Sequence, residues 1–165
     1  FDYPITEKFD TIIGNPPYLK VEDMKNITPV ELPIYKENFK SAYKQFDKYF
    51  LFIEQGLNLL KEDGVLGYIV PSKFTKLGSG KNLRKLLSKN GNLKRIVSFG
   101  ANQVFKDKTT YTCLLFTTKT SNETFTFTEV NNLTQWKIRD YNSLKFNHKK
   151  NCELSDEIWI LVNSD

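Results

Sequence analysis

The sequence predicts an α/β domain with a mainly parallel sheet, helices on both faces and a terminal antiparallel hairpin. Three observations lead to this fold class. Short apolar runs typical of strands alternate with apolar stripes typical of helices along most of the chain. Strands that are joined by helices lie parallel, and helices then cover both faces of the sheet. Two later strand-like runs follow each other across a Thr-Ser-Asn turn without a helix, which is typical of a hairpin.

The first strand is predicted over residues 9–13, where the apolar run ends at Gly14, and we expect it to be buried. Residues 19–40 contain Pro29 and Pro33, and we expect a long loop with a single helical turn. Loops of this length inside a compact domain are usually functional or mobile. This part of the chain is therefore a place to look for function.

The middle of the chain carries the clearest pattern. Apolar residues at three- and four-residue steps predict a helix that ends at Asp63-Gly64, and residues 65–70 form a continuous apolar strand. A second helix is expected over residues 81–89, after a Gly-rich turn, and a further strand over residues 93–99. The first helix presents an apolar stripe made of Phe46, Phe50, Ile53, Leu57 and Leu60.

The last part of the chain is predicted less regularly. The hairpin strands are expected over residues 110–118 and 123–130, and the periodicity fades past Leu133. We therefore expect residues 1–131 to form one structural unit and residues 132–165 to be a linker.

Composition excludes several classes of protein. With 165 residues, 39% hydrophobic and 14% aromatic, the chain has the size and core of one ordinary domain, and neither disorder nor a low-complexity array fits. It has no run close to the ~20 apolar residues of a membrane helix and no leader, so we expect a cytoplasmic protein. Cys113 and Cys152 match no metal spacing, so no metal site is expected, and Cys113 is predicted to pack in the core.

The loop Asn15-Pro16-Pro17-Tyr18 follows the first strand, at the edge where α/β sheets place their ligands. Two prolines fix φ twice and remove two backbone donors. The loop therefore presents two acceptors, the Asn15 amide oxygen and the Pro16 carbonyl, beside the Tyr18 ring. The alternative is a Pro-Pro turn that leaves a strand, with Asn as a cap and Tyr as surface cover. The preceding strand and the long segment that follows favour function.

Two acceptors beside an aromatic ring suit a planar amino group on an unsaturated carbon. The lone pair of such a nitrogen is delocalised, so the nitrogen is a poor nucleophile. If each acceptor takes one N–H, the nitrogen is drawn toward a tetrahedral shape and its lone pair becomes available for attack. Tyr18 can stack on the ring that bears the amino group, which is worth ~1–3 kcal/mol for a base.

Positive charge is concentrated in the middle of the chain. The formal net charge is +5, yet residues 64–106 contain no Asp or Glu and nine Lys or Arg. A polyanionic partner explains this asymmetry, and so does a solvated lysine-rich helix face. Charge alone decides between neither of them.

Three segments resemble a known family. The chain contains IIGNPPY, which resembles the motif of amino methyltransferases that use S-adenosylmethionine. It continues with FDKYFLFIEQGLNLLKEDGVLGYIVPSKF, which resembles the helix and strand after this motif in TaqI-like adenine methyltransferases of restriction–modification systems. The later VSFGANQVFKDKTTYTCLLF is similar to the family segment with a second aromatic that faces the target base. The resemblance covers residues 9–118 and implies the C-terminal part of a Rossmann-like catalytic domain.

The resemblance implies roles for individual residues. Asn15-Pro16-Pro17-Tyr18 would form the catalytic loop, in which Asn15 and the Pro16 carbonyl bind the amino group of an adenine flipped out of double-stranded DNA. Tyr18 and Phe105 would contact the flipped base, although Phe105 also fits as a core residue at a strand end. The predicted contacts to S-adenosylmethionine are Asn15, Asp47 and Tyr49, and those to the DNA backbone are Lys73, Lys76 and Lys106.

The sequence departs from the family at the cofactor end. No Gly-rich loop follows a strand, and the family's cofactor loop and ribose-binding acidic residue belong to earlier strands. We therefore expect that an N-terminal cofactor half and a C-terminal DNA-recognition domain of the same polypeptide are missing, that residues 132–165 lead toward the latter, and that the isolated fragment is inactive. Methyltransferases of RNA bases or of protein glutamine, and a non-catalytic subunit, are the alternatives.

Overall fold

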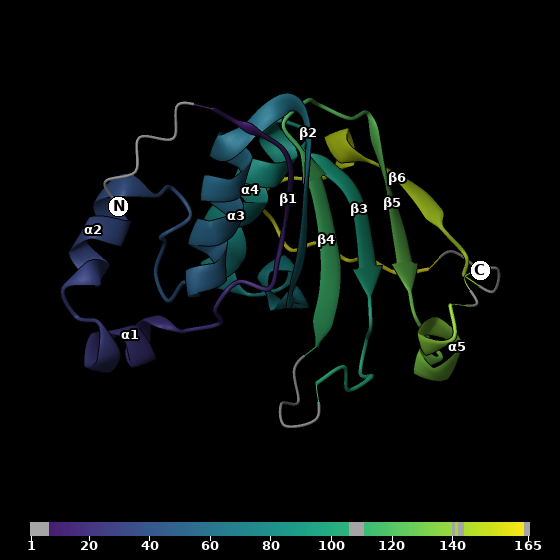
Figure 1. Cartoon of the computed structure of the whole chain (residues 1–165), viewed down its shortest axis with the longest axis horizontal. Helices are drawn as coiled ribbons and strands as arrows, with labels where there is room; N and C mark the ends of the chain where they lie inside the picture. Colours follow the sequence, from purple (N-terminus) through teal and green to yellow (C-terminus); the bar gives the residue numbers. More distant parts are fainter. Residues whose placement is uncertain (1–6, 106–110, 140, 142–143, 164–165) are drawn as a thin grey trace.

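The computed structural model describes residues 7–105, 111–139, 141 and 144–163, which form a six-stranded sheet with helices packed against it (Figure 1). The strands are β1 (Phe9–Gly14), β2 (Leu60–Pro71), β3 (Leu93–Ser98), β4 (Thr112–Thr118), β5 (Thr124–Glu129) and β6 (Asn147–Lys150). The helices are α1 (Val21–Ile27), α2 (Glu31–Asn38), α3 (Lys48–Leu59), α4 (Lys81–Lys89) and α5 (Leu133–Lys137), with short 3-10 helices η1 (Ser72–Thr75), η2 (Gly78–Gly80) and η3 (Asn151–Glu153).

The sheet is mixed, and its strand order is β1-β2-β4-β3-β5-β6. The β1–β2 and β3–β5 pairs are parallel, whereas β4 is antiparallel to both β2 and β3, and β6 is antiparallel to β5. The predicted hairpin of residues 110–118 and 123–130 is therefore wrong, because β4 and β5 lie on opposite sides of β3. The expectation of a mainly parallel sheet gives way to a mixed one for the same reason.

The segment between β4 and β5 explains the error. The end of β4 and the segment after it form backbone hydrogen bonds with the turn before β3. Thr118 N–H donates to Asn92 O (2.9 Å), and Asn122 N–H donates to Gly91 O (2.8 Å). Gly91 has φ +59°, and a Cβ there would lie 2.6 Å from the Ser121 hydroxyl oxygen. The Thr-Ser-Asn segment therefore crosses the start of β3 and does not close a hairpin.

Strand directions place the functional edge. Since β4 is antiparallel to both neighbours, β1, β2, β3 and β5 all run the same way, and their carboxyl ends share one edge with the start of β4. This edge faces the bottom of Figure 1. The loop after β1, the η1 turn after β2 and the segment after β3 therefore meet at one side of the molecule.

Two expectations for the first 40 residues need correction. β1 exists as predicted, but it is largely exposed because it is an edge strand paired only with β2 in the described part of the chain, and Ile13 is 82% exposed. Residues 19–40 form two helices, α1 and α2, instead of a loop. Met24 and Leu32 pack these helices onto the core. Pro33 is tolerated because it lies in the first turn of α2, where no intrahelical N–H bond is lost.

The main core lies between the sheet and the helices α3 and α4. Both helices form, α4 with the predicted bounds and α3 from Lys48, and the turn Gly78–Gly80 leads into α4. The predicted end of the first helix at Asp63-Gly64 is wrong, because α3 ends at Leu59 and the backbone is already extended in β2 from Leu60. Alternate side chains of β2 (Leu66, Tyr68 and Val70) face this core, and Cys113 is buried in it as expected. The opposite face has a smaller cluster around Phe99, against which α5 packs Trp136. Helices thus lie on both faces, but very unequally.

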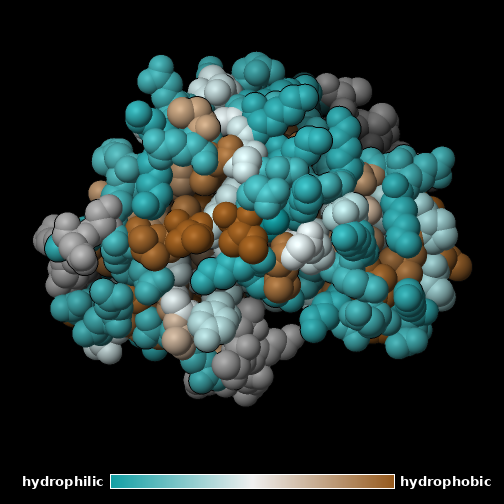
Figure 2. All heavy atoms as spheres, turned by 180° about the vertical axis from the view of Figure 1, so that it is seen from behind, coloured by the Kyte–Doolittle hydropathy of each residue, from teal (hydrophilic) through white to brown (hydrophobic). Residues whose placement is uncertain are grey.

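Described residues after position 132 pair with the sheet and pack against its core. β6 pairs with β5. Trp159 is buried against Phe74, and its backbone N–H donates to Thr75 O (2.9 Å). These contacts attach the described part of residues 132–165 to the sheet, and its expected role as a linker toward a DNA-recognition domain stays a prediction. The last described residues cross behind the sheet in Figure 1, and the face seen in Figure 2 carries a patch of hydrophobic side chains. No helix in the described ranges is long and apolar enough to cross a membrane.

Candidate active site

The Asn15-Pro16-Pro17-Tyr18 loop leaves β1 at the carboxyl edge of the sheet. Pro16 is buried, whereas Asn15 and Pro17 are exposed. The buried ring anchors the loop, and the Asn15 amide stays open to a ligand. Because neither proline carries an N–H, the loop offers carbonyl oxygens without competing backbone donors at these two positions. The expected pair of acceptors for an amino group stays a prediction.

The Tyr18 hydroxyl ties this loop together. It lies 2.5 Å from the Asn15 amide oxygen and 2.6 Å from the carbonyl oxygen of Ile69 in β2. Partial burial raises the pKa of Tyr18 to about 12, with smaller contributions from Cys113 and Asp47. The hydroxyl therefore stays protonated at neutral pH and acts as a donor. In this structure the Asn15 amide turns its oxygen, and not its NH₂ group, toward Tyr18.

Tyr49 supports Tyr18 from the core. Its ring meets the Tyr18 ring edge-on, with 5.9 Å between the ring centroids and 81° between the planes. The Tyr49 hydroxyl donates to Pro71 O (3.0 Å), and complete burial raises its pKa well above the ordinary value. Tyr49 is fully buried and bound to the end of β2. Its expected contact with a cofactor stays a prediction.

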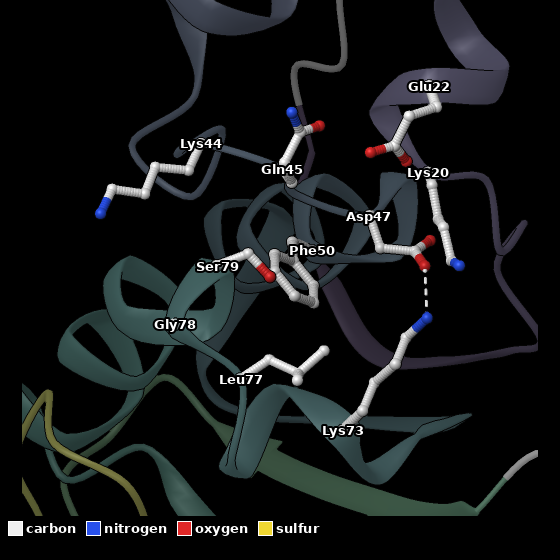
Figure 3. Close-up of a pocket in the computed structure, with 10 residues that line it drawn as sticks. All are labelled: Lys20, Glu22, Lys44, Gln45, Asp47, Phe50, Lys73, Leu77, Gly78 and Ser79. Carbon is white, nitrogen blue, oxygen red and sulfur yellow. Dashed lines mark ion pairs between the residues drawn. The ribbon is translucent and has the colours of Figure 1, made fainter.

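Asp47 joins two segments of the site. One carboxylate oxygen accepts from the Leu19 N–H (2.8 Å), and the other lies 3.1 Å from the Lys73 ammonium nitrogen. Figure 3 shows this ion pair between the start of α3 and the η1 turn. The residue is 4% exposed. Its expected contact with a cofactor also stays a prediction.

The basic residues expected at DNA have different environments. Lys73 forms an ion pair with Asp47, whereas Lys76 is exposed and takes part in none of the ion pairs between described residues. Lys106 lies outside the described residues. Arg84 is structural, because its buried guanidinium donates to Phe74 O (2.6 Å), Leu77 O (2.7 Å) and Asp156 O (3.0 Å).

Phe105 ends the described segment after β3, at the same edge as the Asn15–Tyr18 loop. It is half-buried. Asn102 fixes the segment before it by donating to Phe99 O (3.0 Å) and Val130 O (2.7 Å). The fold thus brings the two predicted base-contacting aromatics to one edge. Their contact with a base stays a prediction.

A pocket of about 410 Å³ adjoins the Asp47–Lys73 pair (Figure 3). Phe50 and Leu77 contribute apolar surface, and Lys20 and Lys44 line the pocket with Lys73. The sequence did not single out Lys20, Lys44 or Leu77, because they come together only through the fold. Lys44 has φ +51°, a left-handed conformation that a lysine rarely adopts, and no sequence pattern signals it.

No cluster of three or more His, Cys, Asp or Glu side chains within the described ranges could hold a metal ion. The single histidine of the sequence, His148, lies in β6 at the far side of the sheet from β1. A histidine of this chain is therefore not positioned to act as a base at the Asn15–Tyr18 loop.

Comparisons with known proteins agree with this geometry. The chain is 52% identical over 154 residues to the type II restriction enzyme and methyltransferase RM.Eco57I of Escherichia coli, which covers 93% of this chain and 15% of that protein. It is 34% identical over 115 residues to the type II methyltransferase M.BstVI of Geobacillus stearothermophilus, which covers 70% of this chain and 20% of that one. The chain thus spans a fifth or less of these relatives.

A solved structure confirms the fold class. It is described as a class I S-adenosylmethionine-dependent methyltransferase of Listeria monocytogenes, and it matches 84% of this chain and 43% of its own with a TM-score of 0.62 at 20% identity. The chain therefore has the α/β Rossmann-like fold expected from the sequence. The family model of the Eco57I restriction-modification methylase matches residues 3–105. With most of its length matched by this model and half its residues shared with RM.Eco57I, the chain belongs to the Eco57I restriction-modification methylase family.

Proposed function

We propose that the complete protein containing this chain transfers a methyl group from S-adenosylmethionine to the exocyclic amino group of adenine in DNA, within a restriction–modification system. The observation that carries this proposal is the loop at the end of β1. There the Tyr18 hydroxyl contacts the Asn15 amide oxygen, and Pro16, which follows Asn15 directly, would supply its carbonyl as the second acceptor. Membership of the methylase family supports the reaction type.

The loop activates the amino nitrogen by binding both of its hydrogens. Asn15 and the Pro16 carbonyl each accept one N–H, which localises the nitrogen lone pair and directs it away from the ring plane. S-adenosylmethionine supplies the electrophilic methyl group. The N–C bond would form as the sulfur–methyl bond breaks and its electron pair stays on sulfur, so that the positive charge passes from sulfur to the nitrogen, where the two oxygens would stabilise it. The nitrogen then releases one proton to water, so no side chain of raised or lowered pKa is needed.

The target base reaches the loop only outside the double helix, because the amino group of adenine is paired and stacked in the duplex. Tyr18 and Phe105 then contact the flipped base, and both lie at the carboxyl edge. Similarity of the sequence to TaqI-like enzymes supports adenine over cytosine. We assign contacts with the DNA backbone to Lys76 and Lys106, since Lys73 is engaged by Asp47.

The described residues fit only part of a cofactor site. They place acceptors at the end of β1 but contain no Gly-rich loop after a strand. In the described part of the chain, β1 pairs on one side with β2 and leaves its outer side free, with Ile13 82% exposed. We assign this free edge to further strands of the complete protein, which would hold most of the cofactor. The isolated chain is then expected to be inactive, and DNA recognition is assigned to another domain.

Mass spectrometry of nucleosides tests the proposal directly. The complete protein is incubated with labelled S-adenosylmethionine and DNA from a bacterial strain without DNA methyltransferases, and the DNA is digested. Label in N6-methyldeoxyadenosine is expected, and the Asn15→Ala protein should yield less than a hundredth of it. Label in methylcytosine, or label only in RNA or in protein glutamine offered in parallel, would show that the proposal is wrong.

A further inference from the structure

Asp47 stands at the first position before α3, where an aspartate normally caps the helix. Its backbone is extended (φ −113°, ψ 145°), as a capping residue requires, yet its side chain makes no cap hydrogen bond. Both carboxylate oxygens point elsewhere: one accepts from Leu19, and the other binds Lys73. A side chain that served only to stabilise α3 would bind the free N–H groups of the helix. Asp47 instead holds the segments around the active-site loop.

The two partners of Asp47 come from the two segments that frame Tyr18. Leu19 follows Tyr18 directly, and Lys73 lies in the turn after β2, the strand to which the Tyr18 hydroxyl is bound. The backbone strengthens this link, since Lys48 N–H donates to Leu19 O (2.9 Å) and residues 20 and 47 form an isolated antiparallel bridge. A shift of the Asp47 carboxylate would therefore move the loop relative to the end of β2.

Burial makes the geometry of this link specific. The side chains of Asp47 and Lys73 are 6% and 34% exposed, so the carboxylate has little water to replace a lost partner. A buried charge that loses its partner must move or take up a proton, whereas an exposed one is solvated. The Asp47–Lys73 pair therefore has one preferred arrangement, in which Leu19 is held in place.

We propose that Asp47 is a positioning residue of the methyl transfer. It acts through the Leu19 N–H and through Lys73, and it sets where Asn15 and Tyr18 stand relative to the end of β2. Only the expected effect on the rate of methyl transfer rests on the proposed function. The positioning role is an alternative to the expected contact between Asp47 and the cofactor, and the two roles give different kinetic results.

Kinetics of the complete protein separate the two roles. Asp47→Ala removes both contacts, Asp47→Asn keeps an oxygen for the Leu19 N–H, and Lys73→Met removes the ion pair alone. A displacement of about 1 Å can cost ~100-fold in rate. We expect Asp47→Ala to lower the single-turnover rate by at least about tenfold, and Asp47→Asn and Lys73→Met to lose less. Dissociation constants for S-adenosylmethionine and for DNA should change by less than about twofold in Asp47→Ala and Asp47→Asn.

The chain offers a matched control in the Glu31–Lys48 ion pair. Its nitrogen–oxygen distance is 2.9 Å, and Glu31 lies in α2, outside the active-site loop. Glu31→Gln should leave the single-turnover rate unchanged. If Asp47→Ala and Lys73→Met also leave it unchanged, Asp47 does not position the loop. If Asp47→Ala instead weakens S-adenosylmethionine binding and retains the rate at saturation, Asp47 is a cofactor contact and the proposal is overturned.

Amide hydrogen exchange tests the link without any reference to catalysis. The Leu19 amide should exchange at least about tenfold faster in Asp47→Ala than in the parent protein, since it loses its acceptor. The same amide should be unaffected in Glu31→Gln. Unchanged exchange at Leu19 would overturn the positioning role even if adenine is methylated. Faster exchange together with no adenine methylation in the parent protein would leave Asp47 as the holder of the loop and contradict only the proposed function.

Discussion

The hydroxyl oxygen of Tyr18 lies within hydrogen-bonding distance of the Asn15 amide oxygen and of the Ile69 carbonyl oxygen, at 2.5 Å and 2.6 Å. A hydroxyl has one hydrogen, so it donates to one of these oxygens at a time. Donation to Ile69 fixes the tyrosine ring to β2. Donation to Asn15 occupies one lone pair of the amide oxygen and leaves the other for a substrate N–H. Tyr18 therefore contributes an oriented acceptor as well as an aromatic ring.

Tyr18→Phe keeps the ring and removes only this hydroxyl. We expect the single-turnover methylation rate to fall about fivefold, because the loss of one hydrogen bond of about 1 kcal/mol loosens Asn15. Tyr18→Ala removes the ring too, and we expect a loss of at least a hundredfold with weaker binding of the flipped base. A Tyr18→Ala protein that methylates as fast as the parent would contradict the stacking role. Equal rates for Tyr18→Phe and the parent would contradict the orienting role.

Asn15→Ala removes one of the two acceptors for the amino group. We expect the methylation rate to fall ~100-fold or more at saturating DNA, as for other groups that stabilise developing charge. DNA binding should stay within about twofold, because backbone contacts dominate the affinity. Asn15→Asp is the informative partner variant, since it keeps an acceptor but adds a charge. Rates close to the parent in Asn15→Ala would argue against the acceptor pair.

Gly91→Ala tests the crossing of the β4–β5 segment over the start of β3. The backbone at Gly91 is left-handed, and the added methyl group would meet Ser121 and the Asn122 backbone. We expect a loss of about 1–2 kcal/mol in the free energy of unfolding, from the left-handed backbone and the contact. Gly78→Ala is the control, because a Cβ there would have no neighbour within 4 Å. Equal stability of the two variants in urea unfolding would speak against this crossing.

Local patterns predicted the elements that local forces determine. The helix at residues 81–89 formed with those bounds, since its apolar stripe and flanking glycines specify a start and an end. The loop Asn15-Pro16-Pro17-Tyr18 was also singled out, because its pattern lies in four consecutive residues, and its catalytic role stays a prediction. The order of the last strands was not predicted. The segment between β4 and β5 is held at the start of β3 by a hydrogen bond between Asn122 and Gly91, which are far apart in sequence.

The sequence also did not predict the exposure of β1 or which distant residues are in contact. The apolar sequence of β1 gives no sign that the strand lies at an edge with an uncovered face. Asp47 and Tyr49 were singled out, but their partners Leu19 and Pro71 lie 28 and 22 residues away. A pattern read along the chain identifies which side chains carry chemistry. It does not show which of them hold the others in place.

Buried Cys113 gives the core a dependence on alkaline pH. Burial raises the pKa of its thiol to about 12, whereas in the unfolded chain the thiol titrates near its ordinary value. The native state therefore keeps a proton that the unfolded state gives up. The contribution of the protonated Cys113 thiol to the free energy of unfolding is complete below the ordinary pKa of a thiol. It is lost as pH rises toward about 12, at up to about 1.4 kcal/mol per pH unit.

Cys113→Ala removes this titration along with some packing. We expect the variant to unfold at a lower temperature than the parent at pH 8, and the difference to shrink as pH rises to about 10.5. Cys152→Ala, at an exposed position, should show no such convergence. Thiol reagents should modify Cys152 in the native protein and reach Cys113 only at the rate of unfolding. If the difference in unfolding temperature between the parent and Cys113→Ala stays constant or grows as pH rises, Cys113 is not buried as a protonated thiol.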